Sequence, residues 1–566
     1  MIDSFSRQET QRGIFRLQWC FRCAIAVCAL ISCWIGRFCI GPDGFSNLDM
    51  GDLYWKGDWH AALNGLWSPL YGWLTGLMFL LTKPTMRWEY PEVQLLNFAI
   101  FIAALFSFEF FWRELLASRG GRAWAGGART YAWVLGYLLF VYVHLLTHPL
   151  ALVTPDLLVA ALVYASSGMM LRFASGRMGA ASAILLGVTL GVGYLAKAAM
   201  LPFAVVFMLT MLVVAWKQHR GKSLLALTLL GFLITSLPFI AALSWNMHRF
   251  TWGDSAKLNY GWSVNHYPRP PLRFWQGDRP GHEDALHPPR KVFAWPEVYE
   301  FAAPIKGTYP VWYDPCYWNA GIDSSIHPLR QAQILIQNMK TMVRAILLKL
   351  PLLATLVLLL LLSKGIQDWW RNLMTFWPIL IPAVAMCLMY MMVHWEARYT
   401  SGEMLIAWGA AIAATGISGV ARRAGLFWAV CLLLGAWVVC RFSTVLIFYR
   451  HSSMSSAQLV MVAERLRAMD IEPGDHVALI GQGFVEEYWA RLEKVRIIAE
   501  VPQGNHRELA ESAAEFWKSS PEVEKTVLGV LKTTGAKAVI ADTPPATLPP
   551  GWVPVGNTGH AIYFFR

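Results

Sequence analysis

Long apolar runs dominate the first 450 residues of the chain. They are about 18–25 residues long, which is enough to cross a bilayer of roughly 30 Å as helices. We predict about eleven such spans from this pattern. They lie near residues 18–40, 93–112, 130–147, 157–171, 179–195, 199–216, 223–245, 345–362, 373–393, 403–420 and 424–447. The chain is therefore predicted to be an α-helical polytopic membrane protein.

The composition agrees with this prediction. Of the 566 residues, 56% are hydrophobic and only 15% are charged, whereas a soluble protein carries roughly a quarter charged residues. The net charge of +12 would suggest nucleic acid as a partner of a soluble protein. Here the cations occupy short connections between apolar runs, so we expect membrane lipids and no nucleic acid as partners.

The distribution of Arg and Lys predicts the orientation in the membrane. Cations gather in alternate connections, such as Arg7–Arg16, Arg113–Arg129, Lys217–Lys222 and Arg422-Arg423. The positive-inside rule makes these connections cytoplasmic, in a plasma or inner membrane. The N-terminus is then inside and the C-terminus outside. Trp67–Leu81 is apolar enough to span, but a span there would reverse every later loop, so we expect an amphipathic helix in the outer leaflet.

The predicted outer face carries three long segments. Residues 41–92 form a first outer loop, and residues 246–330 form an outer cap loop rich in Trp, Tyr, Pro and His. Residues 451–566 form a small extracytoplasmic α/β domain after the membrane module of residues 1–450. Its expected strands are His476–Ile480, Val495–Val501, Ala538–Ala541 and Ala561–Phe565, with helices at Ala457–Met469 and Val523–Thr533.

Acidic residues in the first outer loop are the first candidates for chemistry, because an ionisable group at a membrane edge is costly. Asp49 lies within about ten residues of the first span, and Asp52 shares its helical face. Either carboxylate could act as a general base on an acceptor hydroxyl. The alternative is that one of them caps the helix that starts there.

Two further segments on the same face hold candidates for substrate binding. Trp67 and Tyr71, around Ser68-Pro69-Leu70, could stack on a sugar, or they could be ordinary interfacial anchors. Asp156 follows Thr154-Pro155 where a span begins. It could contact substrate or simply cap its helix.

Two cations lie on the face that the charge rule disfavours. Lys197 stands between two apolar spans without an acid nearby in the sequence, and Arg398 lies in the run His394-Trp395-Glu396-Ala397-Arg398-Tyr399. Both could bind phosphate. Otherwise Lys197 snorkels to the interface, and Arg398 forms a salt bridge with Glu396 or Asp156. We count His394, Glu396 and Tyr399 with them as substrate-binding candidates.

This series of elements resembles the GT-C superfamily of membrane glycosyltransferases, especially the branch with protein O-mannosyltransferases and the aminoarabinose transferase of lipid A. The similar elements are Asp49, Ser68-Pro69-Leu70-Tyr71, Thr154-Pro155-Asp156, Lys197 and Arg398-Tyr399, in that order. The resemblance covers roughly residues 18–450. It implies a polyprenyl-phosphate sugar as donor and a glycan, lipid or protein as acceptor.

The resemblance further implies an inverting displacement at the outer face, with a loop Asp as base and Lys and Arg neutralising the phosphate. In this chain the acidic pair of the first loop is split into Asp49 and Asp52, and Ser68 stands where the aminoarabinose enzymes often have Lys. We assign no metal ligands, and we leave a divalent cation open as a cofactor. The alternative function is a transporter or flippase of a lipid-linked saccharide.

Overall fold

The structure is a computed structural model of the full chain. It describes residues 2–118, 120–121, 124, 128–147, 150–267, 286–287, 289–301, 306–321, 324–347, 350–363, 365–416, 424–503 and 512–565. Parts of the predicted outer cap loop, among them residues 268–285, lie outside this range, as do the predicted cytoplasmic cations Arg119, Arg122, Lys364, Arg422 and Arg423.

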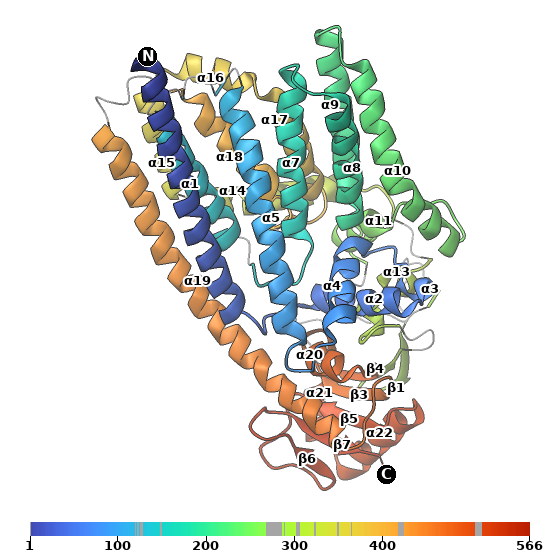
Figure 1. The fold of residues 1–566 in the computed structure, drawn as a ribbon. Helices are drawn as coiled ribbons and strands as arrows, with labels where there is room; N and C mark the ends of the chain where they lie inside the picture. The colour runs from blue at the N-terminus through green and yellow to red at the C-terminus, as the bar shows by residue number, and fades with distance from the viewer. Residues whose placement is uncertain are drawn as a thin grey trace.

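A bundle of long apolar helices forms most of the molecule, and the two termini lie at its opposite ends (Figure 1). Its helices are α1 (Ile2–Ile35), α5 (Glu89–Ala117), α6 (Ala128–Val141) with the π-helical turn η1 (Tyr142–Thr147), α7 (Asp156–Ala174), α8 (Ala180–Ala196), α9 (Met200–Lys217), α10 (Lys222–Asn246), α15 (Leu350–Leu362), α16 (Ile366–Met374), α17 (Trp377–Met391), α18 (Ser401–Ala414) and α19 (Ala424–Arg467). Every predicted span overlaps one of these helices.

Within the described residues, seven helices are long and apolar enough to cross a membrane. Three shorter apolar helices, α8, α17 and α18, coincide with further predicted spans. The span predicted at 345–362 falls on α15, which is bent by 112° against α16. The chain is a polytopic membrane protein, while the count of eleven stays a prediction.

A layer of short helices covers the lower end of the bundle. It comprises α2 (Pro42–Lys56), α3 (Trp59–Ala62), α4 (Pro69–Thr82), α11 (Ser255–Ser263), α12 (Pro310–Tyr313) and α13 (Pro315–Trp318). The longer helix α14 (Pro328–Leu347) contacts α15 and α17 of the bundle. The 14 residues of α4 rise about 21 Å as an α-helix, which is less than the hydrocarbon core of roughly 30 Å. Helix α18, which coincides with a predicted span, has the same number of residues, so the interpretation of Trp67–Leu81 as a helix that does not span stays a prediction.

The C-terminal domain is built on one mixed sheet in the order β1-β2-β4-β3-β5-β7-β6. Its strands are β1 (Arg290–Phe293), β2 (Val298–Glu300), β3 (His476–Gly481), β4 (Arg496–Pro502), β5 (Ala538–Ala541), β6 (Trp552–Pro554) and β7 (Ala561–Phe564), and its helices are α20 (Gly483–Glu493), α21 (Ser512–Lys518) and α22 (Pro521–Thr533). The central strands β4, β3 and β5 are parallel and buried.

Two features join this domain to the rest of the chain. Strands β1 and β2 come from the predicted outer cap loop, and β2 pairs antiparallel with β4. The predicted boundary near residue 450 falls inside α19, whose 44 residues run from the bundle into the domain without a break. The domain is thus tied to the bundle by a rigid helix and by a segment of the cap loop.

Candidate functional site

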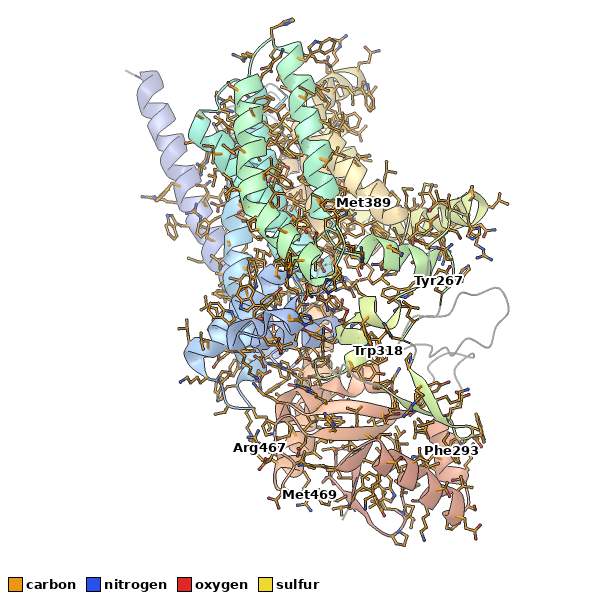
Figure 2. All side chains as sticks on the ribbon, turned by 90° about the vertical axis from the view of Figure 1, so that its right-hand side faces the viewer. Tyr267, Phe293, Trp318, Met389, Arg467 and Met469 are labelled. Carbon is orange, nitrogen blue, oxygen red and sulfur yellow. The ribbon has the colours of Figure 1, made fainter. Side chains whose placement is uncertain are left out.

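A cavity of about 700 Å³ opens at the end of the bundle that faces the C-terminal domain, a size common for ligand pockets. Figure 2 shows Met389, from the cavity wall, at the lower end of the helical bundle, with Trp318 between it and the domain that holds Arg467. Six of the predicted site residues line the cavity, namely Trp67, Asp156, Lys197, His394, Arg398 and Tyr399.

The charged residues of the cavity lie at helix ends or in a connection between helices, where a polar side chain can leave the apolar bundle. Asp156 opens α7 after Pro155, and a carboxylate is favourable at a helix N-terminus. Lys197 ends α8 at the turn into α9. Arg398 lies in the connection between α17 and α18, and Asp43 is in the first turn of α2.

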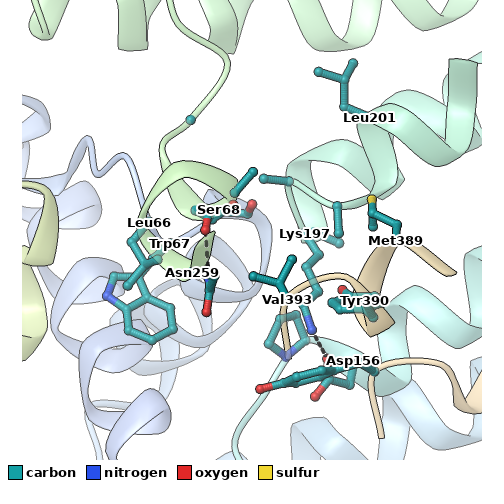
Figure 3. A pocket seen from close by; sticks show the side chains of 18 of the residues that line it. Leu66, Trp67, Ser68, Asp156, Lys197, Leu201, Asn259, Met389, Tyr390 and Val393 are labelled. Carbon is teal, nitrogen blue, oxygen red and sulfur yellow. Dashed lines mark hydrogen bonds and ion pairs between the residues drawn. The ribbon is translucent and has the colours of Figure 1, made fainter. Parts of the chain in front are cut away.

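These four residues form what we call the cavity cluster. Lys197 Nζ lies 2.6 Å from Asp156 Oδ1, as Figure 3 shows. Arg398 donates toward Asp156 at 3.5 Å and toward Asp43 at 3.3 Å. The acid that the sequence did not supply for Lys197 is therefore Asp156, 41 residues away. Two cations and two carboxylates balance each other, and the side chains of Asp43 and Lys197 keep 30% and 23% exposure.

Glu396 and His394 support the cavity cluster from one side. Glu396 accepts from Arg398 Nε at 2.6 Å, and His394 lies 3.0 Å from its other oxygen. Burial would raise the pKa of Glu396, but the hydrogen bond from His394 and the charge of Arg398 outweigh it and lower that pKa to about 2. Both salt-bridge partners expected for Arg398 are thus present, and Glu396 itself is outside the cavity wall.

Aromatic rings form a second wall. Trp262 stacks on Trp312 with ring centroids 6.2 Å apart, and Trp67 meets Trp312 edge to face at 5.8 Å. These three rings come from α11, α12 and the segment before α4, and all three line the cavity. Planar rings of this kind offer apolar faces together with an N–H donor. Because the N–H groups of Trp67 and Trp262 already donate within the protein, these two rings offer a ligand mainly their apolar faces.

A third wall is aliphatic. Leu201, Val205 and Val206 from α9 and Met389 from the adjacent α17 line the cavity together with Val393, just after α17; Figure 3 shows Leu201, Met389 and Val393 around it. Val205 and Met392, next to Val393, are exposed. The cavity therefore combines a charged wall, an aromatic wall and an aliphatic wall.

The two predicted catalytic residues lie elsewhere, in what we call the interface cluster: Asp49, Asp52, Glu89 and Arg491. Arg491 from α20 contacts Asp49 at 2.7 Å, Asp52 at 2.9 Å and Glu89 at 2.7 Å. Asp49 also accepts from the backbone N–H of Thr308 at 2.6 Å and from its hydroxyl at 3.0 Å. Neither Asp49 nor Asp52 lines the cavity.

Tyr71 is also away from the cavity. Its ring is fully buried, and its hydroxyl donates to Asn97 at 2.7 Å. By contrast, sequence reasoning missed Asp43, Trp262 and Trp312 as individual candidates. The available signal for Asp43 was its place in Gly41-Pro42-Asp43, at the first helical turn after the first span. Among the described residues, no group of three or more His, Cys, Asp and Glu side chains is arranged to hold a metal ion.

The sequence matches no protein-family model and no curated protein. The fold does match solved structures. ArnT from Cupriavidus metallidurans in the apo state is 13% identical, with 97% of this chain and 98% of ArnT covered at a TM-score of 0.50. The same protein bound to undecaprenyl phosphate is 12% identical, with 95% and 96% covered at 0.48.

Archaeal oligosaccharyltransferase AglB from Archaeoglobus fulgidus, in complex with an inhibitory peptide and a dolichol-phosphate, is 13% identical. It is covered over 70% of its length, with 93% of this chain, at a TM-score of 0.46. The match to ArnT extends over nearly the whole of both chains. The GT-C fold implied by the sequence resemblance is therefore confirmed, with the C-terminal domain included in the match.

Proposed function

We propose that this protein is a glycosyltransferase that moves a sugar from a polyprenyl-phosphate-linked donor to an acceptor at the extracytoplasmic face of a membrane. The observation that carries the proposal is the cavity itself, in which two cations, three Trp rings and an aliphatic wall meet in one space. A polyprenyl-phosphate sugar joins its sugar ring to a hydrocarbon tail through an anionic phosphate, so it presents the three kinds of group that these walls match. The GT-C fold shared with ArnT supports the same reaction class.

Lys197 and Arg398 are the proposed phosphate ligands. Each already contacts a carboxylate of Asp156 or Asp43. A bound phosphate would replace these carboxylates as the acceptor of the Lys197 and Arg398 hydrogen bonds. A cation paired with an acid at a cavity is more readily exchanged than one sealed in the protein, because water and ligand can replace the partner. The hydrocarbon tail would leave past Leu201, Val205 and Met389 toward the lipid.

The proposed reaction is a single displacement. The acceptor oxygen forms a bond to the anomeric carbon as the bond from that carbon to the phosphate oxygen breaks. The electron pair leaves with the phosphate, whose charge Lys197 and Arg398 neutralise, and a carboxylate takes the proton of the acceptor hydroxyl. Attack from the side opposite the phosphate inverts the anomeric centre.

Asp43 is our proposed base. It lines the cavity and lies 3.3 Å from Arg398. Once phosphate binds Arg398, the carboxylate of Asp43 is free to accept a proton. Asp49 was the base predicted from the sequence, with Asp52 second. Asp49 now has three short donors and is 6% exposed, so an acceptor hydroxyl has little access to its oxygens. A base must lie within about 2.6–3.2 Å of the proton that it removes.

The test is transfer by the purified, reconstituted protein from a panel of undecaprenyl-phosphate sugars, with glycan, lipid and peptide acceptors supplied. We expect one donor to be consumed, with release of undecaprenyl phosphate measured by mass spectrometry. EDTA and added divalent cations in the same assay test metal dependence. If sealed vesicles move a lipid-linked sugar across the membrane without cleaving it, the protein is a transporter and the proposal is wrong.

A further inference from the structure

Arg491 lies at the junction of three parts of the chain. It belongs to α20 of the C-terminal domain, its side chain is 3% exposed, and it contacts two carboxylates of α2 and one of α5. Lys494, the residue directly after α20, adds a contact to Asp52 at 3.3 Å. A buried guanidinium with this many acidic partners holds the domain against the first outer loop.

The same contacts fix the orientation of α2. Asp43 is in the first turn of this helix, and Asp49 and Asp52 follow on the next turns. Six residues of α-helix span about 9 Å, so α2 acts as a short rigid arm between Arg491 and the cavity. Any tilt of α2 at the interface cluster would move Asp43 in the cavity.

The outer cap loop is joined at the same place. Thr308 donates to Asp49 and accepts from the backbone N–H of Ile497 in β4 at 2.9 Å. Close by, Phe484 at the start of α20 meets Trp312 edge to face at 5.0 Å. Helix α20 therefore contacts two parts of the chain that line the cavity, namely Trp312 and α2.

We infer that Arg491 is a positioning residue of the proposed transferase. It locks α2 so that Asp43 faces the cavity, and this gives the C-terminal domain a role in turnover without any contact with the donor. The inference rests on the proposed function for its kinetic part only, because the order of α2 can be measured without turnover. An Arg is required since its planar fork reaches several carboxylates, which a Lys ammonium cannot do with the same geometry.

The test compares Arg491→Gln with Arg467→Gln in the full-length protein. Arg467 ends α19 at the same domain, its side chain is 57% exposed, and among the described residues it pairs with the buried Glu493. Gln at this position can still donate a hydrogen bond to Glu493, so Arg467→Gln is the control for loss of an Arg near the domain. For Arg491→Gln we expect faster hydrogen–deuterium exchange in the α2 peptide Pro42–Lys56. We also expect kcat to fall about 100-fold, the order of a 1 Å misplacement, with the Kd for undecaprenyl phosphate within about twofold of the parent. Arg467→Gln should match the parent in all three measurements.

The outcomes decide whether Arg491 positions α2 or only stabilises the folded protein. Parental exchange in α2 together with parental kcat overturns the inference. Loss of undecaprenyl phosphate binding, with faster exchange throughout the chain, means that Arg491→Gln unfolds the protein. Arg491→Lys then decides, with faster α2 exchange and retained binding in support, and parental values for both against. If the parent consumes none of the donors, the proposed function fails, while the exchange of α2 still judges Arg491.

Discussion

The cavity cluster and the interface cluster both begin on α2, and both pair carboxylates with cations, yet their surroundings differ. In the cavity cluster, Asp43 and Lys197 keep part of their surface open to a space of about 700 Å³. In the interface cluster, Arg491 is 3% exposed and is enclosed by three acids and the C-terminal domain.

This difference separates two uses of the same residue types. Removing one partner of a buried ion pair leaves a charge without compensation, so a closed cluster resists change. A pair at a cavity can exchange its partner for a ligand of the same charge. The cavity cluster is therefore suited to bind and release an anion, and the interface cluster is suited to hold two parts of the protein together.

The largest expected effect separates Asp43 from Asp49. Asp43→Asn keeps size and polarity but cannot accept a proton, and loss of a general base costs on the order of 10²–10⁴-fold in rate. We expect kcat to fall by that factor while undecaprenyl phosphate still binds. Asp49→Asn should reduce kcat less, because it weakens the contact with Arg491 without removing the base. If Asp49→Asn is inactive while Asp43→Asn stays active, Asp49 is the base and Asp43 is not.

The second prediction concerns the stability of the interface cluster. Arg491→Ala leaves Asp49, Asp52 and Glu89 buried without their shared cation, and breaking such a cluster costs about 3–5 kcal/mol. We expect the thermal unfolding midpoint in detergent to fall clearly for this variant. Arg371→Ala, at an exposed pair with Asp368 on α16, should cost about 1 kcal/mol or less. Equal midpoints for the two variants would mean that the buried interface cluster contributes no more to stability than an exposed ion pair.

The third prediction concerns affinity at the cavity cluster. A hydrogen bond to a charged group is worth about 1.5–3 kcal/mol, so Lys197→Ala and Arg398→Ala should each weaken undecaprenyl phosphate binding roughly 10–150-fold. Titration of the purified variants measures this. Parental affinity in both would mean that Lys197 and Arg398 serve only the ion pairs with Asp156 and Asp43.

The sequence was sufficient to predict the helical bundle and much of the cavity. Apolar runs of span length can hardly form anything but helices in lipid, and each predicted span meets a helix. Lys197 and Arg398 were recognisable because the positive-inside rule predicts few cations in the connections where they lie, and both line the cavity. Four expected strands also match β3, β4, β5 and β7 closely.

The choice among acids could not be made from the sequence. Asp43, Asp49 and Asp52 all lie within ten residues on one helix, and what distinguishes them is a partner more than 400 residues away in Arg491. The strands β1 and β2 were missed for the same reason, since their pairing with β4 joins distant segments. Long-range contacts of this kind leave no local pattern in hydrophobicity.

The last prediction concerns the pH dependence of stability at the contact between the cap loop and β4. Glu500 in β4 is buried beside Tyr309 and the N–H of Gly483, and burial raises its pKa to about 7 despite these donors. In the unfolded chain a Glu has a pKa of about 4.3. The folded state thus holds a proton that the unfolded state has lost between these values. Its contribution to stability is complete below pH of about 4.3 and is lost as pH rises through about 7.

We therefore expect the charge state of Glu500 to make stability decline as pH rises over this window. Glu500→Gln keeps a neutral side chain at every pH, so its thermal midpoint should fall less than that of the parent between pH 5 and 7.5. Glu515→Gln, at an exposed pair with Lys518, is the control and should follow the parent. The pKa values of Glu396 and Asp52 are lowered in the folded protein. Their contribution to stability is lost only as pH falls below about 4, outside this window. A slope unchanged by Glu500→Gln would mean that Glu500 has the same pKa in the folded and the unfolded chain, and the prediction would be wrong.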